Sequence, residues 1–332
     1  MRTLSLRELN RTLLRRQLLL QRRRISVHEA VARLVALQAQ YPPSPYVALW
    51  SRIAGFSKHQ LTDAFVDGSI VKAGTLRTTL HVSTREVYPA VAASYIETQR
   101  TRAERLGVSA LRAAVPEGPT EPADLFELGQ RVLGTDDRWS VSFAYRALPF
   151  VRAPPVGQWP HTKVPPLVFW QEPLPDPEAS SFRVVRDYIA AYGPASRDDV
   201  VQFTGFRIGQ IAPALEDLRT FEDEHGVVLY DVPRLPIAAA DTPAPVRFLP
   251  AFDSIILAHR DRSRIVPPEY IETVFNKKNA TTKNTFTVAG FVAGAWRIEK
   301  KRISVEPFEP LPARVRREVD TEAERLLAWY VA

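Results

Sequence analysis

The order of helix breakers between residues 182 and 230 places the strongest constraint on the fold. Apolar residues recur at helical spacing in three stretches, and breaks containing Gly or Pro separate the helical stretches from one another. The segment predicts a helix over 182–192, a second helix over 197–203, a tight turn at Thr204-Gly205, a third helix over 206–218 and two strands over 221–230. Helix, turn, helix and hairpin in this order are typical of a winged-helix unit. A helical pair of this kind also serves in protein–protein contacts.

A similar order is predicted near the N-terminus. Ser5 can cap a helix that runs to about Leu20, with leucines on one face and Arg7, Arg11, Arg15 and Arg22 pointing outward. The following elements are predicted as a helix from the capping box Ser26–Glu29 to near Gln40, where Pro42 and Pro43 end it, helices over 46–53 and 58–66, and two strands between Ile70 and Ser83.

The rest of the chain is patterned less clearly. Residues 88–133 are mostly helical in pattern, and nine prolines between 147 and 177 indicate an ordered connector or a short hairpin with irregular flanks. The tail predicts β-like runs at 246–249, 255–258, 285–288, 291–296 and 303–305, followed by a last helix over 311–329. The fold class is therefore α+β.

Positive charge is concentrated in two places. Residues 1–24 hold eight arginines and one acid, which is a net charge of +7, and residues 274–302 carry a net +6. The whole chain carries +7, so the remainder sums to about −6. Two basic patches on an acidic body favour a polyanionic ligand. Two solvated basic faces without a partner are the alternative.

Several kinds of chemistry have no support in the sequence. The chain has no cysteine, which excludes disulfides, thiol nucleophiles and thiolate metal sites and fits a cytoplasmic protein. No apolar run is long enough to span a membrane. The six histidines lack metal-binding spacing, and there is no phosphate-binding glycine loop or nucleophile elbow. We therefore expect no metal and no cofactor.

Five segments, in order along the chain, resemble the AlkZ-like DNA glycosylase family. They are Leu34-Val-Ala-Leu-Gln-Ala-Gln-Tyr-Pro-Pro43 with Ala48-Leu-Trp-Ser-Arg52, Thr75-Leu-Arg-Thr-Thr-Leu-His-Val82, Tyr192-Gly-Pro-Ala195 through Thr204-Gly205, Phe248-Leu-Pro-Ala-Phe-Asp253, and Val288-Ala-Gly-Phe-Val-Ala-Gly-Ala-Trp-Arg297. The resemblance implies three tandem winged-helix units with a β-rich C-terminal part. We place the units at 1–90, 91–178 (with the proline-rich connector) and 179–235, and the β-rich part and closing helix at 236–332.

The resemblance also implies an activity and a motif. The activity is hydrolysis of the N-glycosidic bonds of alkylated purines in double-stranded DNA, including bulky N7 adducts and interstrand crosslinks. The family's catalytic Gln-x-Gln motif maps onto Gln38-Ala39-Gln40, and a glutamine at the last position matches the branch associated with resistance to DNA-alkylating antibiotics. The resemblance implies an apolar or small middle residue, and Ala39 is small. Without the resemblance, two glutamines at a helix end indicate solvated polar residues.

The motif contains no carboxylate, although glycoside hydrolysis usually uses two. An N7-alkylated purine is already cationic and leaves as a neutral base, so it needs little help from a general acid. A glutamine can hold the attacking water through its carbonyl and donate its amide to a sugar or phosphate oxygen. We expect a monofunctional enzyme, because the nearest lysines, Lys58 and Lys72, are predicted to be surface residues.

Further residues are candidates for contact with DNA. Asp253 is expected to be structural, whereas His81 is either a structural histidine or a site contact. Arg207 and Gln210 begin the second helix of the helix-turn-helix, where phosphate or base contacts fall. The full set of predicted DNA-binding residues is Arg52, Arg77, His81, Arg207, Gln210, Lys277, Lys278 and Lys283.

Two other functions remain open at this point. A winged-helix transcription regulator binds DNA without catalysis, usually as a dimer, but the chain has no obvious dimerisation helix and we expect a monomer. A nuclease is the third alternative, and no acidic metal-binding pattern supports it. The sequence leaves open which adduct is the substrate and whether the base is flipped out of the duplex.

Overall fold

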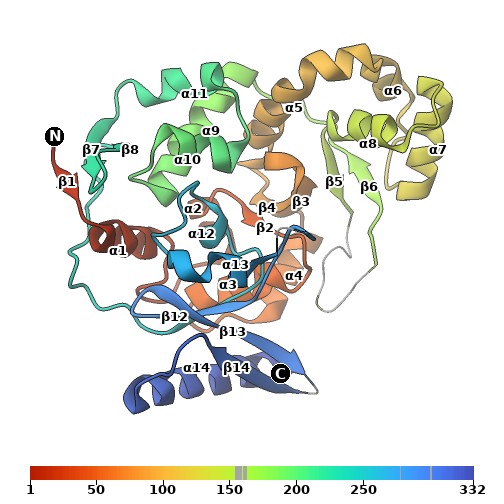
Figure 1. Ribbon diagram of the computed structural model, residues 1–332. Coiled ribbons are helices and arrows are strands. Elements are labelled where there is room, and N and C mark those ends of the chain that lie inside the picture. The colour runs from red at the N-terminus through yellow and green to blue at the C-terminus, as the bar shows by residue number, and fades with distance from the viewer. Residues whose placement is uncertain (154–158, 160–162, 277, 300) are drawn as a thin grey trace.

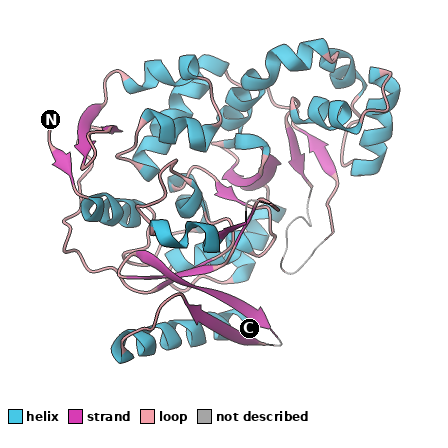
Figure 2. Cartoon of the chain, viewed as in Figure 1, coloured by secondary structure: helices cyan, strands magenta, loops and turns pink. Residues whose placement is uncertain are grey.

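Helices and small sheets alternate along the whole chain, which gives the mixed α+β fold predicted from the sequence (Figure 2). The computed structural model describes residues 1–332 except 154–158, 160–162, 277 and 300. Three groups of three helices, each followed by two antiparallel strands, make up most of the first 231 residues.

The elements of these groups, with the segments beside them, have the following bounds. The N-terminal segment contains β1 (Thr3–Leu4) and α1 (Leu6–Arg16). The first group contains α2 (Val27–Arg33), β2 (Leu37–Gln38), α3 (Ser44–Arg52), α4 (Lys58–Val66), β3 (Ile70–Gly74), the 3-10 turn η1 (Leu76–Thr78) and β4 (Leu80–Thr84). After α5 (Tyr88–Arg105), the second contains α6 (Val108–Ala114), α7 (Pro122–Leu133), α8 (Arg138–Arg146), β5 (Phe150–Arg152) and β6 (Leu167–Phe169). The third contains α9 (Pro177–Tyr192), α10 (Arg197–Thr204), α11 (Ile208–Leu215), β7 (Arg219–Asp223) and β8 (Val228–Asp231).

The third group follows its sequence signals closely. The Ser196 hydroxyl accepts a hydrogen bond from the Asp199 N–H, and the Asp199 carboxylate accepts one from the Ser196 N–H, which completes a capping box at the start of α10. Gly205 has a φ of 73° and ends α10 in the left-handed conformation that glycine tolerates best. The turn predicted at Thr204-Gly205 is confirmed.

The C-terminal part contains a second sheet and a closing helix. Its elements are β9 (Arg247–Leu249), α12 (Ser254–Leu257), the 3-10 turn η2 (Pro268–Tyr270), α13 (Ile271–Val274), β10 (Phe275–Asn276), β11 (Thr281–Thr282), β12 (Thr285–Val288), β13 (Phe291–Glu299), β14 (Arg302–Pro307) and α14 (Ala313–Val331). Figure 1 shows α14 beside β12–β14 at one end of the molecule, with α5–α8 at the opposite end.

Strands from distant segments share two of the sheets. The largest sheet has the order β2-β4-β3-β5-β6, so it combines the strand pairs of the first two groups. The N-terminal strand β1 pairs in parallel with β7, and α1 packs against α9. The N-terminal segment, which we placed in the unit 1–90, therefore contacts the third group.

A fully buried ion pair joins the first group to the C-terminal part. The Arg52 guanidinium at the end of α3 donates to both carboxylate oxygens of Asp253, at 2.9 and 2.8 Å, and neither side chain is exposed to solvent. Asp253 also caps α12 by accepting from the Ile255 N–H. Asp253 thus has the structural place expected for it. Arg52, which we expected to contact DNA, is enclosed in the protein, and this expectation is wrong.

The helix predicted to reach Gln40 ends instead at Arg33. Val35 adopts a left-handed φ of 65°, and the hydroxyl of Tyr192 donates to the carbonyl of Leu34. The chain then pairs with β4 as strand β2. This long-range pairing, rather than the two following prolines, determines the end of the helix.

Three further expectations are corrected. Residues 255–258, predicted as a strand, belong mainly to helix α12, because Asp253 caps a helical turn there. Arg11 was expected on the outer face of α1 but is buried, where its Nε donates to the carbonyl of Thr242. Lys72 was expected on the surface but is buried in β3. Arg7 and Arg15 are exposed, as expected.

The buried ion pair predicts a large loss of stability when one partner is removed. Asp253→Asn leaves the Arg52 guanidinium buried without a counter-charge, so we expect the free energy of unfolding to fall by about 3–5 kcal/mol in urea titrations. The matched control is Glu318→Gln, which breaks the exposed Arg314–Glu318 pair on α14 and should cost under about 1 kcal/mol. Equal losses in the two variants would contradict the structural role of Arg52–Asp253.

Candidate nucleotide-binding site around Gln38

Gln38 lies on β2, the edge strand of the five-stranded sheet, and its side chain is on the face of the sheet opposite the apolar core of the first group. On β2, Leu37 pairs with Val82 and Gln38 pairs with His81, so consecutive residues point to opposite faces. Leu37 and Val82 belong to the apolar core that includes α2–α4. Gln38 therefore faces the opposite side of the sheet.

The Gln38 side chain is fixed by Arg77. The Nη2 of Arg77 donates to the Oε1 of Gln38 at 3.1 Å, and the Nη1 of Arg77 donates to the carbonyl oxygen of Phe203. Arg77 has a φ of 53° in the turn between β3 and β4, and its guanidinium lies over the Phe203 ring. Burial lowers the pKa of Arg77 to about 10, so it stays charged at neutral pH. Arg77, one of the predicted DNA-binding residues, thus holds the first glutamine of the motif.

Gln40 is placed differently. Its side chain is exposed, and its Oε1 accepts a hydrogen bond from the Leu80 N–H at 2.9 Å. Between the two glutamines, Ala39 is buried without exposure, and its N–H donates to the Leu80 carbonyl at 2.7 Å. The buried position of Ala39 explains why the middle residue of the motif is apolar. The expected helix end is wrong: Gln38 is the last residue of the short edge strand β2, and Gln40 follows it by two residues.

Gln38 and Arg77 line a pocket of about 330 Å³. The other residues that line it are Gln202, Phe252, Leu257, Arg262, Phe275, Asn276, Ala280, Thr281 and Thr282. One wall is the β10–β11 hairpin, which contributes five of them. No aspartate or glutamate is found among the described residues of this lining, so the pocket has an excess of positive charge.

His81 is buried behind the glutamine motif. Its Nδ1 donates to the Thr79 carbonyl at 3.1 Å and lies 3.2 Å from the Thr75 hydroxyl. Burial and the nearby charge of Arg77 lower the pKa of His81 to about 3, so the ring is neutral at physiological pH. A histidine that is only 2% exposed is not placed to contact DNA directly. The prediction of His81 as a DNA-binding residue is therefore wrong, and the structure supports its structural alternative.

The remaining predicted DNA contacts lie in two places. Arg207 is exposed at the start of α11 and donates to the Thr98 carbonyl, while the Gln210 side chain is directed towards α5 and α9. Lys278, in the β10–β11 hairpin, and Lys283, just after it, are both exposed. Lys277 lies outside the described residues. The sequence did not predict Arg262, Gln202 or Phe275, because no motif connects these positions to residue 38.

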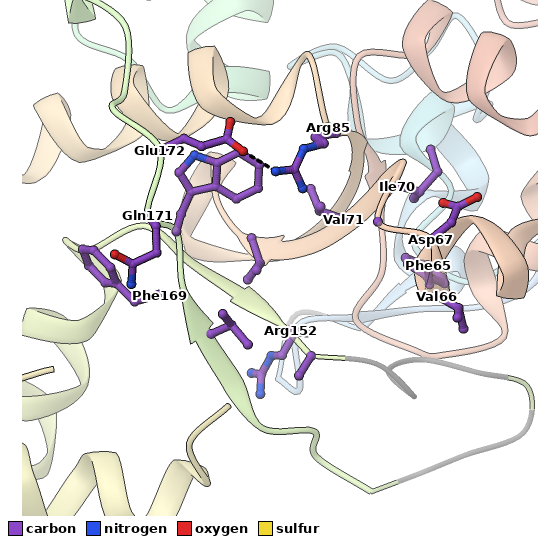
Figure 3. A pocket seen from close by; sticks show the side chains of 15 residues that line it. Phe65, Val66, Asp67, Ile70, Val71, Arg85, Arg152, Phe169, Gln171 and Glu172 are labelled. Carbon is purple, nitrogen blue, oxygen red and sulfur yellow. Dashed lines mark hydrogen bonds and ion pairs between the residues drawn. The ribbon is translucent and has the colours of Figure 1, made fainter. Parts of the chain in front are cut away.

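A second pocket, of about 380 Å³, lies beside the same sheet, where the end of α4 and β3 meet β5 and β6. Figure 3 shows the Arg85–Glu172 ion pair on one side of it and Phe65, Val66 and Asp67 on another. None of the predicted site residues lines this pocket. It differs from the Gln38 pocket in having both acidic and basic side chains around an apolar floor.

The described residues contain no group of three or more His, Asp or Glu side chains placed to hold a metal ion. In the same part of the chain, no helix has the length and apolar character that crossing a membrane requires.

The sequence matches the DNA glycosylase AlkZ-like family over residues 31–329, which is most of the chain and includes the Gln38 pocket. The chain belongs to the AlkZ-like DNA glycosylase family. It is therefore a DNA glycosylase, an enzyme of DNA repair whose substrate is DNA. A search of curated proteins finds no match.

Among solved structures, the fold is similar to that of the Streptomyces sahachiroi DNA glycosylase AlkZ. The TM-score is 0.75 at 20% sequence identity, and the match covers 99% of this chain and 97% of that chain. At this identity the similarity establishes the shared fold. The match extends over nearly the whole length of both chains, so it includes all three helix groups and the C-terminal sheet of this chain.

Because two histidines are buried in the neutral form, we expect the free energy of unfolding to fall in mild acid. Burial lowers the pKa of His81 to about 3 and that of His259 to about 4, whereas both titrate near 6.5 when unfolded. The unfolded state then binds more protons below pH 6.5, so stability falls as the pH decreases. We expect a loss of about 2 kcal/mol for each histidine between pH 7 and pH 5, measured by urea unfolding.

The control compares two substitutions. His81→Gln should remove about half of this pH dependence, whereas His59→Gln, on the exposed surface of α4, should leave it unchanged. If His81→Gln keeps the full difference between pH 7 and pH 5, His81 is not the buried neutral group described here.

Proposed function

We propose that this glycosylase hydrolyses the N-glycosidic bond of cationic N7-alkylated purines in double-stranded DNA, including bulky adducts and interstrand crosslinks. The observation that carries the proposal is Gln38, held by Arg77 in a pocket whose described lining has no carboxylate. The Gln-x-Gln form of the motif supports a role in protection against a DNA-alkylating natural product.

We also propose that the three helix groups are winged-helix units that hold the duplex. Each has three helices followed by a pair of antiparallel strands, which is the order expected for a winged helix. The corresponding units are those placed at 1–90, 91–178 and 179–235, with 236–332 as the C-terminal part. The chain is expected to act as a monomer.

Gln38 is proposed to hold the attacking water. A carbonyl oxygen has two lone pairs, and one on Oε1 accepts from Arg77, which leaves the second for a water proton. The same bond fixes the orientation of the amide, so its N–H groups point away from Arg77 and can donate to a sugar or phosphate oxygen. Positioning of this kind supplies much of the rate when bond cleavage itself is easy.

The charge of the pocket favours a particular leaving group. Without a carboxylate, the described lining cannot protonate a departing base or form an ion pair with an oxocarbenium-like sugar. A cationic N7-alkylpurine departs as a neutral molecule and needs no proton. The same lining has no lysine among its described residues, which supports hydrolysis without a Schiff-base intermediate.

Gln40 is proposed to orient the strand and the DNA. Its carbonyl oxygen is occupied by the Leu80 N–H, so it is less suited than Gln38 to hold water. Its amide N–H groups remain available to the backbone of DNA in the exposed position that it occupies. Lys278 and Lys283 are proposed to contact phosphates beside the pocket, because both are exposed at the hairpin that forms its wall.

The two glutamines predict different losses of activity. On a duplex with one N7-alkylguanine, in EDTA, Gln38→Ala should reduce single-turnover base release by about 10²–10³-fold, as for loss of a group that stabilises the transition state. Gln40→Ala should cost about tenfold, because one hydrogen bond is worth roughly 1 kcal/mol and about 1.4 kcal/mol is a factor of ten in rate. Gln171→Ala, at the second pocket, is the matched control and should be fully active. Full activity of Gln38→Ala would remove Gln38 from the mechanism.

The substrate charge gives an independent prediction. The wild-type enzyme should release N7-methylguanine and leave an alkali-labile site, while uracil and unmodified guanine in the same sequence stay intact. The reason is that a neutral amide supplies no proton to a poor leaving group. Release is measured by chromatography of free base. Comparable release of uracil would contradict a mechanism that depends on a cationic base.

A further inference from the structure

Arg262 is a partly buried arginine for which the described residues provide no acidic partner. It follows α12, and its guanidinium lies 4.1 Å from the centroid of the Phe275 ring. Its Nε is buried and has no hydrogen-bond partner. Its neighbours differ: Arg260 pairs with Asp198, and Arg264 donates to the carbonyl of Pro194. Of these three arginines, Arg262 alone has no carboxylate or carbonyl bound to it in the described structure.

The unpaired guanidinium of Arg262 lies at the candidate site. Arg262 lines the same pocket as Gln38 and Arg77. Burial is the main reason that the pKa of Arg77 is lowered, and the positive charge of Arg262 lowers it further. Two guanidinium groups that share a pocket without any described acidic residue repel each other and are partly dehydrated. Partly buried charges are stable when an opposite charge neutralises them.

The geometry of the two arginines suits an oxyanion with several acceptors. The Arg262 guanidinium lies over the Phe275 ring, and both residues line the pocket. An aromatic face can hold a guanidinium in this way while its N–H groups stay available to a ligand. Arg77 has five N–H donors, and Gln38 and Phe203 are the two acceptors bound to its terminal nitrogens. A guanidinium group with free N–H donors and no carboxylate partner can bind a phosphate through paired, charge-assisted hydrogen bonds.

We infer that Arg77 and Arg262 together bind one phosphate of the DNA backbone, the phosphate next to the nucleotide whose base is released. The inference rests on the proposed function, because Gln38 in the same pocket must then face the sugar of that nucleotide. Arg262 is a DNA-binding residue in this proposal, and its stacking on Phe275 couples the phosphate site to the β10–β11 hairpin.

The test measures binding rather than excision. The full-length protein is titrated with a duplex that carries an uncleavable abasic-site analogue, and single neutral methylphosphonate linkages are placed in turn at each position around it. Affinity is followed by fluorescence anisotropy between about 50 and 200 mM salt. The wild type should lose affinity most strongly at one linkage adjacent to the analogue.

The plot of log K against log salt has a negative slope, and Arg262→Gln is expected to make this slope shallower by about 0.9, which corresponds to the loss of one phosphate contact. The methylphosphonate that weakens the wild type should have little further effect on this variant. Arg262→Met, which keeps an unbranched chain over Phe275, is measured beside it, and thermal melting confirms that both variants are folded. Arg314→Gln, an exposed arginine on α14, is the control and should keep the wild-type slope.

Two outcomes would overturn the inference. One is a wild-type scan in which no linkage next to the analogue matters more than the distant ones. The other is a folded Arg262 variant that loses the same affinity as the wild type at every methylphosphonate position. Because the duplex cannot be cleaved, the result does not depend on which base the enzyme releases, and failure of the glycosylase assay on N7-alkylguanine is recognised separately.

Discussion

The buried Arg52–Asp253 ion pair is the interaction on which the position of the candidate site depends. Two charges removed from water are stable only with close and complete pairing, and here both carboxylate oxygens accept from one guanidinium. Asp253 starts α12, and the hydroxyl of the next residue, Ser254, donates to the Ala36 carbonyl and accepts from the Gln38 N–H. A continuous path therefore leads from α3 through the ion pair to strand β2. The backbone of Gln38 is fixed by residues more than 200 positions away.

The arginines of this chain differ in where their charge is placed. Arg11 is enclosed, and Arg16 and Arg52 are paired with carboxylates of the protein, so none of the three lines the Gln38 pocket. Arg77 and Arg262 line that pocket, and its described lining has no carboxylate to balance their charge. Net charge alone does not separate these two sets of arginines, because the N-terminal segment is the most basic region of the sequence and yet contains Arg11 and Arg16. The partner of each guanidinium, rather than the number of arginines, indicates where a polyanion binds.

Local signals explain which parts of the fold the sequence predicts well. Ser5 and Ser196 form capping boxes, Gly205 ends a helix, and the two strands between Ile70 and Ser83 form as β3 and β4, because each depends on residues close in sequence. The end of α2 and the helix at 254–257 depend instead on Tyr192, β4 and Asp253, which are brought near by the tertiary fold. The same contrast between local and tertiary determinants explains which site residues could be predicted from the sequence. The glutamine motif is contiguous and was recognised by its resemblance to a family, whereas Arg262 and Phe275 join it only through the fold.

The location of charge connects the pocket to the chemistry proposed for it. Before cleavage, the positive charge of an N7-alkylated purine is on the base, and in the oxocarbenium-like transition state it moves towards the sugar. Two guanidinium groups near a cationic base would oppose binding unless an anion lay between them and the reacting nucleotide. A backbone phosphate held by Arg77 and Arg262 would be that anion, and it would lie next to the sugar, where positive charge develops. The electrostatic stabilisation that a carboxylate gives in other glycoside hydrolases would then come from the DNA itself, while Gln38 positions the water and the nucleotide.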